Sequence, residues 1–186
     1  MSNIKNTAHI LNNEKINIRR SAIEQRARWA YAIYNEAKND GTDIEQAMRR
    51  AISKVGQQNG NKEKEKLGDN ITASKYGKYF CTKPLNETFE KKIIKDEENH
   101  FECSLNYCPL IKAWQEMGCD DETCALLCDI ATEGDKAVAK AVGLDLEIKT
   151  TIAKGNDYCH LIFLLIHLQY KIYYFLFLYF RFVVQL

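Results

Sequence analysis

The spacing of apolar residues changes along this chain, and this change limits the fold more than any other feature. Between Ser21 and Gly56 they recur every three or four residues, which is the period of a helix with one buried face. From Tyr76 to Tyr107 short apolar runs and alternation predict strands, and alternation between Leu144 and Phe163 predicts a β-hairpin. Helices first and strands late predict an α+β fold, in which an N-terminal helical hairpin packs with a small antiparallel sheet and further helices.

Two capping patterns predict where the N-terminal helices begin. The segments 21–24 and 42–45 each place a hydroxyl side chain three residues before a glutamate, and a glycine at 41 and at 56 follows each apolar stripe. The next segment, 57–70, is polar and punctuated by glycine, so we expect an exposed connection there.

The two ends of the chain do not continue these patterns. Residues 1–20 are polar and rich in asparagine, which predicts a flexible N-terminal arm before a domain over residues 21–163. Residues 164–186 form an atypical apolar and aromatic tail. Three interpretations of this tail are open: a membrane-spanning helix that places Lys171 near its middle, a further strand, or a C-terminus altered by a shifted reading frame.

Charge and cysteine usage limit the class of protein. The 26 basic and 25 acidic residues are scattered and give a net charge of +1, which argues against a nucleic-acid partner. The N-terminus lacks an apolar core of signal-peptide length, so we expect a cytoplasmic protein whose seven cysteines are reduced. Association with a membrane is expected only if the C-terminal tail is native. No feature of the sequence indicates an oligomeric state.

Cys108 stands directly before Pro109, at the start of a helix predicted over residues 109–117. Proline is favoured at the first helical position, which makes Cys108 the N-cap residue. Unpaired amides and the helix dipole stabilise an anion there, so we expect a thiol pKa below its ordinary value of about 8.5 and an enriched thiolate nucleophile. Two alternatives remain open: a buried cysteine that only packs, and a cysteine that binds a metal.

The spacing of the cysteines is unlike that of a local zinc site. No pair is separated by two residues, as in a zinc knuckle, so we expect no cofactor. A zinc site assembled in space from Cys108, Cys128 and Cys159 is the alternative, since spacing along the chain does not exclude it.

Three motifs stand out between residues 20 and 163: Tyr107-Cys108-Pro109, Leu127-Cys128 followed by Gly134-Asp135, and Gly155-x-Asp157-x-Cys159. With these motifs, this part of the chain resembles the L-2-amino-thiazoline-4-carboxylic acid hydrolase family. The resemblance implies a hydrolase acting on a carbon–nitrogen bond of a small cyclic amidine. L-2-amino-thiazoline-4-carboxylate, which opens to a carbamoyl-cysteine-type product, is the substrate that the family name implies.

Five residues are carried over from these motifs. The resemblance implies catalytic roles for Cys108, Asp135 and Asp157, and binding or supporting roles for Cys128 and Cys159. In the implied mechanism, the Cys108 thiolate adds to the amidine carbon while Asp135 or Asp157 transfers protons. A rival mechanism uses the three cysteines to hold Zn²⁺ and a water nucleophile. The alternative function is a non-catalytic module that binds a small molecule or metal in the same cysteine-lined pocket.

Overall fold

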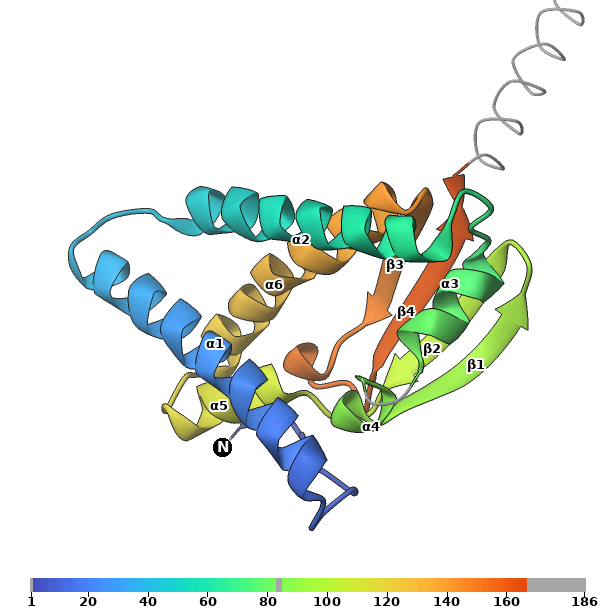
Figure 1. The fold of residues 1–186 in the computed structure, drawn as a ribbon. Helices are drawn as coiled ribbons and strands as arrows, with labels where there is room; N and C mark the ends of the chain where they lie inside the picture. The colour runs from blue at the N-terminus through green and yellow to red at the C-terminus, as the bar shows by residue number, and fades with distance from the viewer. Residues whose placement is uncertain (1, 83–84, 167–186) are drawn as a thin grey trace, which may run out of the picture.

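The fold consists of a four-stranded antiparallel sheet with helices packed on one face (Figure 1). The computed structural model describes residues 2–82 and 85–166 of the chain. The elements are α1 (Glu14–Asn39), α2 (Glu45–Leu67), α3 (Ala73–Phe80), α4 (Leu85–Phe89), β1 (Lys91–Glu97), β2 (His100–Leu105), α5 (Pro109–Glu116), α6 (Asp121–Ala141), β3 (Leu144–Thr150), the 3-10 turn η1 (Ile152–Lys154) and β4 (Cys159–Leu165). This architecture confirms the predicted α+β class.

The strands lie in the order β1-β2-β4-β3, and every neighbouring pair is antiparallel. Phe101 of β2 pairs with Phe163 of β4, which in turn pairs with Leu146 of β3, and all three are buried. Because successive side chains of a strand point to opposite faces, these residues form one apolar face. Helices α3 and α6 cover this face, as the edge-on contact of Tyr76 with Phe163 shows for α3 (Figure 1).

Helix α2 packs along α6 because two of its glycines allow the backbones to approach closely. A Cβ atom on Gly56 would collide with the carbonyl oxygen of Gly134, and one on Gly60 would lie 2.8 Å from that of Val138. The sequence placed the end of this helix at Gly56 and an exposed connection after it, and both predictions are wrong because α2 continues to Leu67. Packing on α6 outweighs the low helix propensity of glycine here.

Two other local predictions also differ from the structure. Helix α1 begins at Glu14, capped by the side chain of Asn13, so the predicted start at Ser21 is wrong and residues 14–20 belong to the helix. The strand expected just after Tyr76 is wrong, since this segment is α3.

Residues 2–10, here called the N-terminal segment, lie against the domain. The Ser2 hydroxyl donates to Asp121 at 2.6 Å, Ile4 is buried, and the Gln115 side chain donates to the Ile4 carbonyl oxygen at 3.1 Å. Two elements distant in sequence, α5 and α6, therefore hold the segment that the sequence predicted as an arm.

A buried ion pair anchors the C-terminal end of this segment. Arg20 Nη2 lies 2.9 Å from Glu90 Oε1, and both side chains are almost completely buried. The backbone amides of His9 and Ile10 also donate to Glu90 Oε1, at 2.7 and 2.8 Å. Burial alone raises the pKa of Glu90, but the hydrogen bonds from Ile10, His9 and Arg20 outweigh burial and lower the pKa.

We expect Glu90→Gln to lower the free energy of unfolding by about 3–5 kcal/mol at neutral pH, because it leaves the Arg20 guanidinium charged, buried and unpaired. Urea unfolding of the wild type and the variant measures this difference. Glu116→Gln is the matched control, since Glu116 is half exposed and pairs with Arg28 at the surface, where the loss is about 1 kcal/mol or less. Equal losses in the two variants would contradict the interpretation.

One interpretation of the C-terminal tail was a membrane-spanning helix. Within residues 2–82 and 85–166, no helix is both long enough and apolar enough to cross a membrane. Most of the C-terminal tail, residues 167–186, lies outside the described residues, so the three interpretations of the tail stay predictions.

Candidate functional site

Cys108 occupies the junction between β2 and α5. It is the N-cap residue of α5, with extended backbone angles (φ −133°, ψ 112°), and Pro109 follows at the first helical position, as predicted. Its side chain makes no capping hydrogen bond of ordinary geometry. The backbone amides of Ile111 and Leu110 nevertheless lie close enough to the sulfur to lower its pKa.

Burial decides the protonation of this thiol. Cys108 is 8% exposed, and desolvation raises its pKa to about 12, with further upward contributions from Cys159 and Asp135. The two helix amides act in the opposite direction but are outweighed. The predicted lowering of the Cys108 pKa is therefore wrong for the free protein, and the sulfur is a neutral thiol at pH 7.

The structure brings Cys108, Cys128 and Cys159 together. Burial raises the pKa of Cys128, and its electrostatic interactions with Cys108 and Cys159 raise the pKa further, so the three sulfurs are near one another. Cys159 accepts a hydrogen bond from the Ile152 amide at 3.4 Å, and burial raises its pKa to about 11. We call these three neutral thiols the cysteine cluster. Cys108 comes from the junction of β2 and α5, Cys128 from α6 and Cys159 from β4.

Asp135 lies beside the cysteine cluster on α6. It is seven residues after Cys128, which puts both side chains on the same face of the helix two turns apart. Burial raises its pKa to about 6, Lys91 lowers the pKa and Glu63 raises it. Asp135 is nevertheless exposed to solvent. The carboxyl group is therefore near the protein interior yet accessible to a small molecule from solvent.

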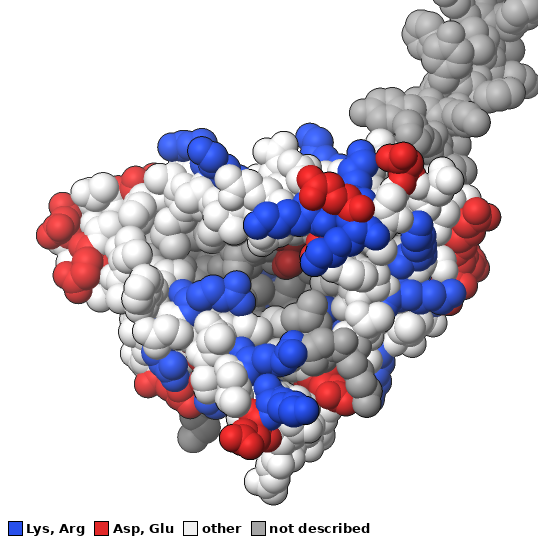
Figure 2. Space-filling model, in the orientation of Figure 1, with Lys and Arg blue, Asp and Glu red and all other residues white. Residues whose placement is uncertain are grey.

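A hollow is visible at the surface of the domain. Figure 2 shows a hollow near the centre of this face, with Lys and Arg side chains around its rim and acidic atoms inside it. Independently of this hollow, a carboxyl pKa near neutrality, such as that of Asp135, is typical of a group that transfers protons.

Asp157 does not join this cluster. It lies exposed in the turn between η1 and β4. Within the described part of the chain, no hydrogen bond or ion pair connects it to Cys108 or to Asp135. Its predicted catalytic role stays a prediction, and its position makes it a natural control for Asp135.

Three ionisable residues near Asp135 were missed by the sequence analysis. The Tyr76 hydroxyl donates to Glu63 Oε2 at 3.1 Å, and burial raises the pKa of both groups. Lys91 is 7% exposed, and its ammonium donates to the Phe80 carbonyl oxygen at 2.8 Å and lies 3.2 Å from the Phe80 ring centroid. Burial lowers the Lys91 pKa to about 8.

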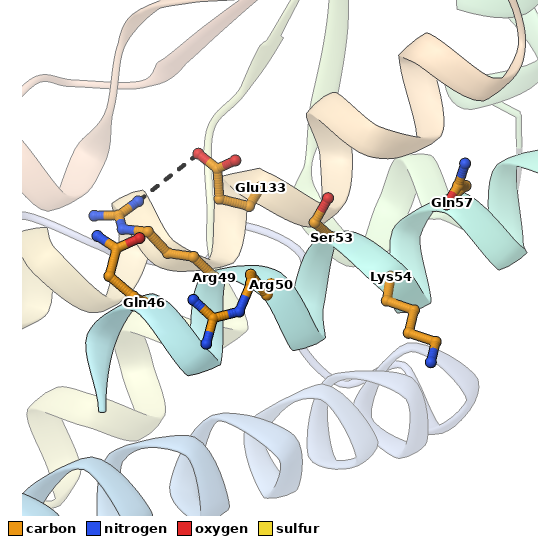
Figure 3. A pocket seen from close by; sticks show the side chains of 7 residues that line it. All are labelled: Gln46, Arg49, Arg50, Ser53, Lys54, Gln57 and Glu133. Atoms are coloured by element: carbon orange, nitrogen blue, oxygen red, sulfur yellow. Dashed lines mark ion pairs between the residues drawn. The ribbon is translucent and has the colours of Figure 1, made fainter. Parts of the chain in front are cut away.

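A separate pocket of about 440 Å³ lies on the outer side of α2 and α6 (Figure 3). Arg49 forms ion pairs there with Glu45, Asp129 and Glu133, at 2.8, 2.7 and 3.7 Å. Its charge is therefore balanced by three carboxylates, and none of the residues lining this pocket belongs to the cysteine cluster. We place the candidate site at Cys108 and Asp135.

Metal coordination was one interpretation of the cysteine cluster. Across residues 2–82 and 85–166, no three Cys, His, Asp or Glu side chains are arranged so that they could hold a metal ion.

The raised pKa of Asp135 has a consequence for stability. A carboxyl group that binds its proton more tightly in the folded state stabilises the fold most at pH values below its unfolded pKa, and this contribution disappears as pH rises to about 6. We therefore expect Asp135→Asn to raise the thermal midpoint at pH 7.5 more than at pH 4, as calorimetry at the two pH values measures. Asp157→Asn, at the exposed turn, should show no such difference, and a pH-independent effect of Asp135→Asn would contradict the assignment.

Comparison with known proteins gives a family match and one similar solved structure. Residues 20–163 match the family model described as L-2-amino-thiazoline-4-carboxylic acid hydrolase. No curated protein matches the chain. Among solved structures, trafficking protein particle complex subunit 3 from Naegleria fowleri, crystallised covalently bound to palmitic acid, is similar with a TM-score of 0.52 and 13% identity, over 82% of this chain and 96% of that chain. At this identity the likeness shows a shared fold alone. Because the family match spans most of the sequence, the chain belongs to the L-2-amino-thiazoline-4-carboxylic acid hydrolase family.

Proposed function

We propose that the protein is a hydrolase that opens a small cyclic amidine, such as L-2-amino-thiazoline-4-carboxylate, to a carbamoyl-cysteine-type product. The family match supports the reaction class. The single observation that carries the assignment to a site is the nearness of Asp135 to the Cys108 thiol. The Asp135 charge raises the pKa of that thiol, and its own pKa of about 6 leaves Asp135 ionised at neutral pH. A neutral thiol needs a base before it can attack, and a carboxylate with this pKa is well matched to that task.

The first half of the reaction forms a bond to the enzyme. The Asp135 carboxylate takes the Cys108 proton, and the sulfur adds to the amidine carbon of the substrate. The amides of Leu110 and Ile111 stabilise the negative charge on the sulfur as the proton leaves. Protonated Asp135 then returns the proton to the ring heteroatom that leaves the amidine carbon, and the ring opens.

The second half releases the product. Asp135 takes a proton from a water molecule, whose oxygen adds to the same carbon, and the Cys108 sulfur departs and recovers its proton. The sum is the addition of one water molecule to the substrate, with the enzyme regenerated. Lys91 is buried and has no ion-pair partner among the described residues, so its ammonium is suited to attract a substrate carboxylate.

Direct assay tests the proposal. Purified protein is incubated with L-2-amino-thiazoline-4-carboxylate and related rings, and mass spectrometry follows the gain of one water molecule. Activity that persists in chelator, in protein without bound zinc, supports the cysteine mechanism. Activity that is lost in chelator, with one zinc per chain in the untreated protein, supports the rival metal mechanism.

The raised pKa values of all three thiols favour a second candidate, a binding module that does no chemistry. Neutral sulfurs, of which those of Cys108 and Cys159 are buried, suit a pocket that holds a small molecule, and the structural relative from Naegleria fowleri is covalently bound to a fatty acid. Intact-mass measurement of the protein as purified, before and after thioester cleavage with hydroxylamine, tests for such a ligand. Absence of turnover on every ring, together with a retained ligand mass, favours this candidate.

A further inference from the structure

Asn6 lies outside the residues that match the family, yet its side chain contacts the backbone of Cys108 twice. Its Oδ1 accepts a hydrogen bond from the Cys108 N–H at 2.9 Å, and its Nδ2 donates to the Cys108 carbonyl oxygen at 2.8 Å. These two groups belong to the peptide planes on either side of the Cys108 Cα atom. Since each peptide unit is planar, one side-chain amide fixes both planes.

The two planes determine where the Cys108 sulfur lies relative to α5. With both planes fixed, the backbone angles of Cys108 are fixed, and its side chain can choose only among a few staggered positions. The sulfur then lies close to the first free amides of α5, those of Leu110 and Ile111. Rotation of either plane turns the sulfur away from these amides.

Contacts on both sides of Asn6 keep it in this place. Ser2 and Ile4 precede it and are hydrogen-bonded to α6 and α5. His9 follows it and donates to Glu90, which is held by the buried pair with Arg20. The N-terminal segment is therefore held at both ends, with Asn6 between them.

We propose that Asn6 is a positioning residue for Cys108, which holds the cysteine backbone so that the α5 amides stabilise the thiolate as it forms. The effect of Asn6 on turnover rests on the proposed function, whereas its effect on the reactivity of the Cys108 thiol does not. The N-terminal segment thus completes a site whose reactive group lies a hundred residues later in the chain.

Steady-state kinetics of Asn6→Ala test the effect on turnover. We expect kcat to fall by about tenfold or more while KM changes by less than about threefold, because the variant misplaces the attacking sulfur and leaves the substrate contacts in place. Ser2→Ala is the matched control, since it removes an exposed anchor of the same segment, and it should leave kcat within about twofold of the wild type. An unchanged kcat in Asn6→Ala, or an equal loss in Ser2→Ala, overturns the proposal.

Labelling of Cys108 with iodoacetamide at mildly alkaline pH, read by peptide mass spectrometry, needs no substrate. Cys108 should react about threefold or more slowly in Asn6→Ala, because the thiolate loses amide stabilisation, while Cys159 keeps its rate. Faster or unchanged reaction of Cys108 means that Asn6 merely covers the thiol and overturns the proposal. If Cys108 is labelled more slowly in Asn6→Ala but the wild type turns over no ring, only the hydrolase assignment is wrong. If Cys108→Ala abolishes turnover but Asn6→Ala leaves it unchanged, only the positioning role of Asn6 is wrong.

Discussion

Alanine in place of Cys108 should lower kcat for the cyclic amidine by about a thousandfold or more, because the other two thiols of the cysteine cluster lack the α5 amides that stabilise the attacking sulfur. The sulfur is the one atom placed both at the start of α5 and beside Asp135. The truncation removes only one small, buried atom, so the fold and its thermal midpoint should change little compared with the loss of rate. Product formation measured by mass spectrometry, together with the circular dichroism of the variant, separates these effects.

The control for this variant is Cys119→Ala. Cys119 lies between α5 and α6, is partly exposed, and is influenced by Cys124 and Asp120 rather than by the cysteine cluster. Its loss should leave kcat unchanged. If Cys108→Ala retains more than about a tenth of wild-type turnover, attack by this sulfur is wrong, and a water nucleophile activated by Asp135 or by a metal takes its place.

Asparagine in place of Asp135 should lower kcat/KM by about 10²–10⁴-fold at pH 7.5, the usual contribution of a positioned general base. A base works in its deprotonated form, so wild-type kcat/KM should rise with pH through about 6, where Asp135 loses its proton. Asp135→Asn should lose this limb of the profile as well as the rate. Measurement of kcat/KM from pH 4.5 to 8 records both.

Asp157→Asn is the matched control for this pH profile, because it makes the same chemical change at an exposed turn in another of the motifs that carry the family resemblance. It should keep both the rate and the limb near pH 6. If Asp135→Asn still shows the rise of kcat/KM near pH 6, another group causes that rise. If Asp157→Asn loses most of its kcat/KM, Asp157 has the catalytic role that the family motif implies.

The sequence predicts those parts of the fold in which local pattern and tertiary packing agree. Alternation from Leu144 to Phe163 becomes the β3–β4 hairpin, and Pro109 marks the first residue of α5. Helix α2 is the counterexample. Its glycines at 56 and 60 read locally as helix breakers, but they are the contact surface for α6, which only the packed structure reveals.

The same distinction explains what was missed at the candidate site. The helix dipole at Cys108 is a local effect and was recognised, whereas the desolvation that raises its pKa comes from the surrounding fold. Glu63 and Lys91 stand in polar runs and therefore look like surface residues. Glu63 follows Gly56 by seven residues and Gly60 by three, so the helical period of α2 already assigns it to the side that faces α6.

The absent side chains at Gly56 and Gly60 also set the distance between two carboxyl groups. They let the helix carrying Glu63 and the helix carrying Asp135 come nearly into backbone contact, and the Glu63 charge raises the pKa of Asp135. A relative with alanine at either position would have these two helices pushed apart. The proton affinity of Asp135 can therefore change without any substitution at the candidate site.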